Sequence, residues 1–154
     1  MFTLGFKHKY NIATNTVAAK NYMRSNIPNP RLVDYFKREI EPKIPEKLRK
    51  FDEKLNSIGF PERNYYLYGS FARGTPTPRS DVDIGVVIES TQGINSLDFY
   101  NLLQAKGTLD RIKGARIELS LWDQESFQPI IERESEGVRE ISPEKSAGNP
   151  EALG

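Results

Sequence analysis

The sequence contains no cysteine and a single histidine, His8. Without cysteine the chain forms no disulfide and offers no thiolate to a metal ion, a composition that fits a reducing compartment. We therefore expect a cytoplasmic protein. With one histidine near the start, catalysis by histidine and a histidine-rich metal site are both disfavoured. Any reaction chemistry is expected to depend on carboxylates, hydroxyls and the backbone.

Long hydrophobic runs and a strong charge bias are also missing. No apolar run approaches the roughly 20 residues of a membrane span, and the first residues lack the order of a secretory signal. The 22 Lys and Arg residues nearly balance 21 Asp and Glu, which gives a net charge of +1. The overall charge therefore favours neither a membrane nor a nucleic acid as partner.

The 154 residues are expected to form one folded domain with two extensions. Residues 1–30 are polar and basic, and we interpret them as a loosely ordered N-terminal arm, either a simple extension or a segment that binds an acidic or nucleic-acid partner. The folded domain is predicted over residues 31–141. Residues 142–154 have almost no large apolar side chains and are predicted to be disordered.

Hydrophobic spacing predicts helices and strands within the domain. Residues 32–40 and 44–55 have helical spacing interrupted by Pro42, which indicates two helices or one kinked helix. Strands are predicted at residues 65–68, 82–88 and 115–122. The predicted fold class is therefore α/β (α+β), a small mixed sheet with helices packed on one face.

Two later helices are expected around the third strand. Ser96 is the predicted N-cap of the first, whose apolar face would carry Leu97, Tyr100 and Leu103. Ser126 is the predicted cap of the second, which would hold Phe127, Ile130 and Ile131.

The most informative stretch joins the first two strands. Gly69-Ser70 is followed by ten residues and then by Asp81-Val82-Asp83 at the start of the second strand. Because strand side chains alternate, Asp81 and Asp83 should project together, opposite the apolar row that begins at Val82. Paired carboxylates of this kind suit Mg²⁺, and the amides after a glycine turn can bind phosphate.

These residues resemble the nucleotidyltransferases of the DNA polymerase beta-like superfamily, whose signature is Gly-Ser followed about ten residues later by Asp-x-Asp on a strand. Ala72-Arg73-Gly74 and Ser80 also match the fuller signature of the small, minimal nucleotidyltransferases. The resemblance extends from Tyr65 to about Trp122. It implies the nucleotidyltransferase fold and a transfer of NMP to an acceptor hydroxyl.

The resemblance also implies roles for individual residues. Mg²⁺ or Mn²⁺ would be held by Asp81, Asp83 and a third carboxylate on the third strand. Glu118 stands where the family usually has Asp, and it would ligate the metal, act as a base through a water, or lie on the surface; Asp123 is the alternative. The implied nucleotide-binding residues, for ATP as the expected substrate, are Gly69, Ser70, Arg73 and Ser80.

The acceptor is left open by the sequence. Small relatives with this signature include antitoxins that transfer AMP to a tyrosine of a HEPN-type toxin, and this is the preferred interpretation. Alternatives are a degenerate transferase that binds nucleotide or partner, a nucleotide sensor, and an antibiotic-modifying enzyme. Two further positions are ambiguous: Gly85 would leave room for a base or sugar or mark a bulge, and Trp122 would stack on a ligand or pack against the sheet.

Overall fold

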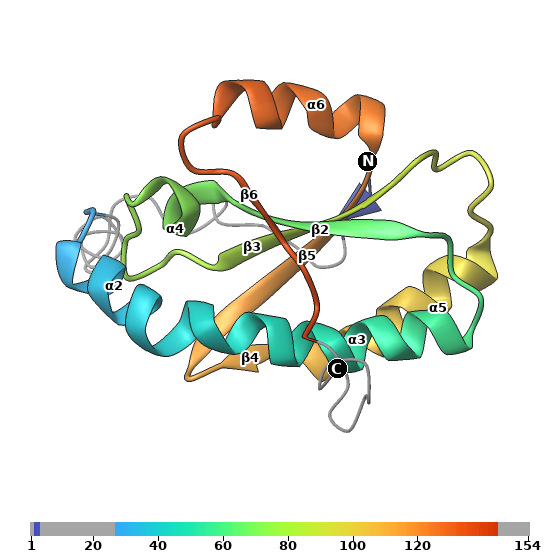
Figure 1. The fold of residues 1–154 in the computed structure, drawn as a ribbon, viewed down its shortest axis with the longest axis horizontal. Coiled ribbons are helices and arrows are strands. Elements are labelled where there is room, and N and C mark those ends of the chain that lie inside the picture. The colour runs from blue at the N-terminus through green and yellow to red at the C-terminus, as the bar shows by residue number, and fades with distance from the viewer. Residues whose placement is uncertain (1, 4–26, 145–154) are drawn as a thin grey trace, which may run out of the picture.

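A central mixed β-sheet organises the structure, a computed structural model that describes residues 2–3 and 27–144 (Figure 1). The strand order is β1-β5-β3-β2-β6, with β4 paired to β5. The strands are β1 (Phe2–Thr3), β2 (Arg63–Tyr68), β3 (Val82–Ile88), β4 (Arg111–Ile112), β5 (Ala115–Asp123) and β6 (Arg139–Ile141). Most of the predicted N-terminal arm (1–30) and tail (142–154) lies outside the described residues.

The helices lie on both sides of this sheet. The α-helices are α2 (Pro30–Tyr35), α3 (Ile44–Ser57), α4 (Gly69–Arg73), α5 (Ser96–Lys106) and α6 (Gln124–Arg133). The π-helical turn η2 (Phe36–Ile40) and the 3₁₀ turns η3 (Glu41–Lys43) and η4 (Gly107–Leu109) complete the set. Within the described part of the chain, no helix is both long and apolar enough to cross a membrane.

Helices α2 to α3 form one helical run that changes character around Pro42. Proline lacks the N–H that an α-helix needs and its ring crowds the preceding turn. The chain accommodates this with η2 before the proline and η3 around it, and it resumes an α-helix at Ile44. Of the two forms that the spacing allowed, the structure shows the interrupted single run.

The main core lies between the sheet and helices α3 and α5. The even-numbered row of β3, from Val82 to Ile88, is buried here against the apolar stripe of α3. That stripe consists of Ile44, Leu48, Phe51 and Leu55, each 0% exposed. The spacing of three and four residues in the sequence predicted this face of α3. Because α3 lies below the sheet in Figure 1, most of the buried apolar surface that stabilises the fold lies on that side.

The opposite face of the sheet is covered by α6 (Figure 1). Phe127 of α6 is buried against Tyr68 and Val87, which project from this side of β2 and β3. The sequence predicted helices on one face of the sheet. The two longest helices, α3 and α5, do lie on the same face, but α6 covers the other face. This helix closes over the face that carries Asp83.

The predicted helix caps were wrong by a few residues. Asn95, not Ser96, caps α5, because its side chain accepts from the Asp98 N–H at 2.8 Å while Asp98 accepts from the Asn95 N–H. Asp123, not Ser126, caps α6. The side-chain oxygens of Asn95 and Asp123 accept hydrogen bonds from the free amides of the first helical turn. Each of these caps lies before the serine that the sequence had suggested.

The buried side of α5 also differs from the prediction. Leu97, Tyr100 and Leu103 are 65%, 56% and 40% exposed. Leu102 and Ala105 face the core instead. The helix has apolar side chains on two sides. Packing against α3 buries the side with Leu102 and Ala105, which was not the side predicted from the sequence.

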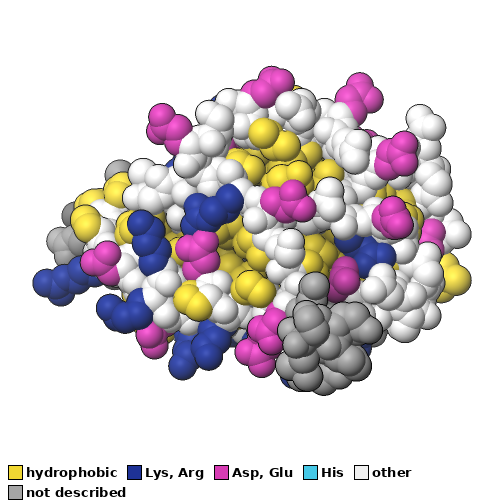
Figure 2. Space-filling model, viewed as in Figure 1, with side chains coloured by type: hydrophobic (Ala, Val, Ile, Leu, Met, Phe, Trp, Pro, Cys, Tyr) yellow, Lys and Arg dark blue, Asp and Glu magenta, His cyan; other side chains and the backbone are white. Residues whose placement is uncertain are grey.

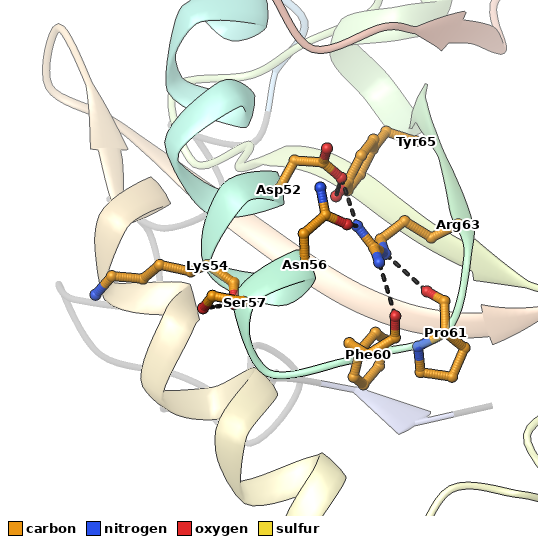
Figure 3. A network of polar contacts seen from close by, with 8 residues as sticks. All are labelled: Asp52, Lys54, Asn56, Ser57, Phe60, Pro61, Arg63 and Tyr65. Atoms are coloured by element: carbon orange, nitrogen blue, oxygen red, sulfur yellow. Dashed lines mark hydrogen bonds and ion pairs between the residues drawn. The ribbon is translucent and has the colours of Figure 1, made fainter. Parts of the chain in front are cut away.

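A polar network joins the end of α3 to the start of β2 (Figure 3). The Arg63 guanidinium donates to Asp52 at 2.7 Å, to Asn56 at 2.9 Å and to the Phe60 carbonyl at 2.8 Å. Its side chain is only 5% exposed. The Tyr65 hydroxyl donates to the same Asp52 oxygen at 2.5 Å. Burial, and then this hydrogen bond, raise the pKa of Tyr65 far above its ordinary value.

Replacing Arg63 should therefore destabilise the fold more than replacing a surface arginine. Arg63→Met leaves the Phe60 carbonyl without this donor and leaves the Asp52 carboxylate with the Tyr65 hydroxyl but without its positive partner. We expect a loss of about 2–3 kcal/mol in the free energy of unfolding. Arg49→Met, which removes an exposed pair with Glu53 on the same helix, should cost about 0.5 kcal/mol or less. Urea denaturation followed by circular dichroism measures both, and equal losses would contradict the role given to the network.

Candidate functional site

The turn from β2 into α4 depends on Gly69. Its φ is +82°, a conformation that side chains rarely adopt, and a Cβ there would lie 2.1 Å from Oδ2 of Asp83. Only glycine satisfies both conditions. The absence of a side chain lets the Asp83 carboxylate lie directly against the turn, so the phosphate cradle and the acidic motif predicted from the sequence meet at this contact.

Ser70 and Ser80 fix the proline-containing loop that separates the two halves of the motif. The Ser70 hydroxyl donates to Oγ of Ser80 at 2.8 Å, and the Thr77 N–H donates to the same oxygen at 2.9 Å. Ser80 thereby holds residues 77–80 as a compact turn next to α4. Both serines were predicted to bind nucleotide; the structure shows them bonded to each other across the loop.

Two of the predicted acidic residues lie on adjacent strands. Strands β3 and β5 are parallel, and Asp83 stands opposite Glu118 in their register. Glu118 is 3% exposed, whereas Asp83 is partly buried. Glu118 is therefore an interior residue beside Asp83, and the possibility that it is a surface side chain is excluded.

Asp81 stands just before β3 and faces a different space. Asp83 lines a pocket of about 470 Å³ together with Gly69, Ser70 and Arg73, and Asp81 lines a second pocket of about 790 Å³. No group of three acidic or histidine side chains suited to a metal ion is found in the described part of the chain. The motif thus lies between two pockets, with one aspartate on each.

Asp123, the alternative third carboxylate, does not belong to this site. It pairs with Ile88 at the opposite end of β3 from Asp83. Its carboxylate accepts from the hydroxyl and N–H of Ser126, and also from Thr91 at 3.2 Å. The Ser126 hydrogen bonds hold the pKa of Asp123 below its usual value. Asp123 is a helix cap, so Glu118 is the remaining candidate on β5.

An aromatic wall forms one side of the 470 Å³ pocket. Trp122 packs edge-on against Phe127, with ring centroids 5.4 Å apart, and Tyr68 also contacts both rings edge-on. A Cβ on Gly85 would lie 3.2 Å from the Phe127 ring. Gly85 therefore makes room for this wall, in a regular strand, rather than for a base or a bulge. The buried indole N–H of Trp122 has no hydrogen-bond acceptor among the described residues.

Glu134, which no sequence motif identified, reaches the phosphate cradle from the end of α6. Its Oε1 accepts from the Gly69 N–H at 3.0 Å and lies 3.0 Å from the Arg73 guanidinium. The Glu134 side chain is 10% exposed. Gly137 holds the following turn against α4, because a Cβ there would lie 2.8 Å from the Ala72 carbonyl oxygen. A carboxylate thus sits on the donors that a phosphate would use.

A match to a known protein family agrees with this arrangement. The pattern of the nucleotidyltransferase domain family matches residues 43–141. Among solved structures, the chain is similar to a candidate nucleotidyltransferase from Sulfolobus solfataricus, at 20% identity and a TM-score of 0.37, over 65% of this chain and 86% of that one. A search of curated proteins gives no significant match. The family match covers well over half of the chain, including the Gly-Ser turn, both aspartates and Glu118, and the chain therefore belongs to the nucleotidyltransferase domain family.

Proposed function

We propose that this protein moves AMP from ATP to an acceptor hydroxyl and releases pyrophosphate. The observation that carries the proposal is the contact between Gly69 and Asp83, with Glu118 beside Asp83 on the neighbouring strand. This contact places two carboxylate side chains, which can ligate a metal ion, next to a turn whose amides can bind phosphate. Membership of the family supports nucleotide transfer in general.

Asp83 and Glu118, which are paired on neighbouring strands, would hold Mg²⁺ or Mn²⁺, and Asp81 would join them from the start of β3. Hard divalent cations prefer carboxylate oxygens, and Mg²⁺ is usually held by one or two carboxylates together with substrate phosphates. A cluster of three preassembled ligands is therefore not required. When bound, the cation would neutralise the charge that develops on the phosphates.

The chain's own residues would bind the nucleotide and direct the reaction. The Gly69 N–H and Arg73 would bind the outer phosphates, after releasing Glu134. The wall of Tyr68 and Trp122 would pack against the sugar or base. These contacts fix the α-phosphorus beside Asp83.

Transfer then proceeds by substitution at the α-phosphorus. A bond forms between the acceptor oxygen and the α-phosphorus, and the bond from that phosphorus to the bridging oxygen breaks. Pyrophosphate leaves with the electron pair. Glu118 would take the proton of the acceptor hydroxyl on a carboxylate oxygen, directly or through a water, from its place next to Asp83.

The preferred acceptor is a tyrosine hydroxyl of a HEPN-type toxin partner, which would make this protein a cytoplasmic antitoxin. The support is the match of Ala72-Arg73-Gly74 and Ser80 to the signature of the small relatives. A protein that had lost catalysis would instead act by binding nucleotide or partner. An antibiotic as acceptor is the remaining alternative.

Removal of the Asp83 carboxylate should abolish transfer. With ATP labelled on the α-phosphate, Mg²⁺ and a lysate that contains the neighbouring gene product, we expect Asp83→Asn to lower the rate at least about 100-fold. Asp34→Asn, on the exposed side of α2, is the matched control and should keep the wild-type rate.

The labelled product decides among the acceptors. Label on a protein would support the antitoxin role, and mass spectrometry would locate the tyrosine. Label only on small molecules would favour the antibiotic alternative. Wild-type transfer that persists in Asp83→Asn would refute the proposed chemistry, and ATP binding without any transfer would favour the binding protein.

Glu134 should weaken the affinity for ATP in the wild type, because its carboxylate competes with phosphate for Gly69 and Arg73. We expect Glu134→Gln to lower the dissociation constant of a non-hydrolysable ATP analogue by roughly threefold to tenfold, which corresponds to about 1 kcal/mol. Isothermal titration calorimetry measures it, with the exposed Glu132→Gln of the same helix as control. Weaker binding in Glu134→Gln would show that this carboxylate supports the nucleotide rather than competing with it.

A further inference from the structure

The 790 Å³ pocket next to Asp81 gathers positive charge from separate parts of the chain. It lies between α2, the loop at residues 77–81 and the β4–β5 hairpin. Six of the chain's 22 basic residues line it, together with one of its 21 acidic residues, Asp81. The six are Arg31, Arg38, Arg79, Arg111, Lys113 and Arg116. In a protein with a net charge of +1, this is a strong local concentration.

The positive charge continues beyond the pocket. A smaller adjoining pocket of about 190 Å³ shares Arg111 and Lys113 and adds Lys43, Lys47 and Lys50. Figure 2 shows much of the Lys and Arg colour towards the α2 end of the molecule and the start of α3, whereas the Asp and Glu colour is scattered over the face. The basic residues thus gather at this end of the molecule, with some acidic residues among them.

The floor of the larger pocket is apolar and held in place. It includes Leu32 and Ile40 from the first helical run and Phe71 from α4. Phe71 packs against Phe36, with ring centroids 4.9 Å apart. The Tyr35 hydroxyl donates to the Lys113 carbonyl at 3.2 Å and ties the helix to the hairpin. The volume lies in the range of ordinary ligand pockets.

The position of this pocket relative to the cradle suggests its role. Transfer at phosphorus requires the attacking oxygen to approach opposite the leaving group. The cradle of Gly69 and Arg73 lies in the pocket of Asp83, and the basic pocket reaches the motif at Asp81. If pyrophosphate leaves on the cradle side, the acceptor enters from the basic pocket.

We propose that the basic pocket binds the acceptor, and that the acceptor is an acidic polypeptide segment whose hydroxyl side chain lies at the Asp81 end. This inference rests on the proposed nucleotidyl transfer. The arginines would pair with carboxylates of the segment, and the apolar floor would take the ring of its acceptor residue.

The surroundings of the pocket favour a polypeptide over a nucleic acid. A nucleic acid carries charge at every backbone step and is bound along a long basic path. Here acidic residues stand among the basic ones: Glu39 lies 3.5 Å from the Arg38 guanidinium, and Glu46 lines the adjoining pocket. A short acidic segment whose acceptor side chain lies on the apolar floor of the pocket matches this pattern better.

Fluorescence anisotropy with the full chain tests the proposal. The probes are a labelled peptide of glutamates around one tyrosine, the same peptide with lysines in place of glutamates, and a single-stranded RNA of equal length. Lys113→Glu with Arg116→Glu reverses two exposed charges of the pocket, and Lys54→Glu with Lys106→Glu reverses two outside it. Circular dichroism confirms that each variant is folded, and Lys113→Gln with Arg116→Gln provides a milder change.

We expect the acidic peptide to bind the wild type and the control equally, and the Lys113/Arg116 reversal to weaken binding about tenfold or more. The glutamine pair should give a smaller loss, and the lysine peptide should not bind. Equal binding by all variants, no binding of the acidic peptide, or tighter binding of RNA would each overturn the proposal.

The same titration with Asp83→Asn separates this inference from the proposed reaction. Because Asp83 lies in the other pocket, peptide binding should persist in this variant while label transfer is lost. Peptide binding in a wild type that transfers no label would refute the reaction and, with it, the role of the pocket as an acceptor site.

Discussion

The contact between Gly69 and Asp83 is the constraint on which the site depends. A carboxylate can lie against the backbone of the turn only because position 69 lacks a side chain and adopts a positive φ. The register of β2, β3 and β5 then places Tyr68 and Glu118 on either side of Asp83. One close approach thus sets the spacing between the amides proposed to bind phosphate and the acidic side chains.

The two faces of the sheet differ in what they carry: the main hydrophobic core lies on one and the candidate site on the other. The face toward α3 and α5 is filled by aliphatic side chains that exclude water. The face toward α6 carries Asp83, Glu118 and the aromatic wall, and it opens into the pocket beneath Glu134. The alternation of side chains along β3 makes this division possible, because one strand serves both faces at once.

Charge is arranged unevenly around the motif. On the Asp83 side, Glu134 neutralises Arg73 and covers the Gly69 N–H. On the Asp81 side, six basic side chains surround a single carboxylate. Under the proposed function, this arrangement would keep the phosphate-binding groups paired in the absence of nucleotide and would attract a negatively charged acceptor.

The sequence by itself determined the strand Val82–Ile88, the stripe of α3 and the Gly-Ser and Asp-x-Asp motif, because each depends on the spacing of neighbouring residues. The caps and the buried side of α5 were predicted wrongly, because neighbouring residues in the sequence were equally suitable and the folded structure uses the other ones. Only the tertiary structure decided that Glu118 rather than Asp123 stands beside Asp83, that Glu134 reaches Gly69 across 65 positions of sequence, and that six basic residues share one pocket. These relations are set by strand register and helix packing, which join segments that no local pattern connects.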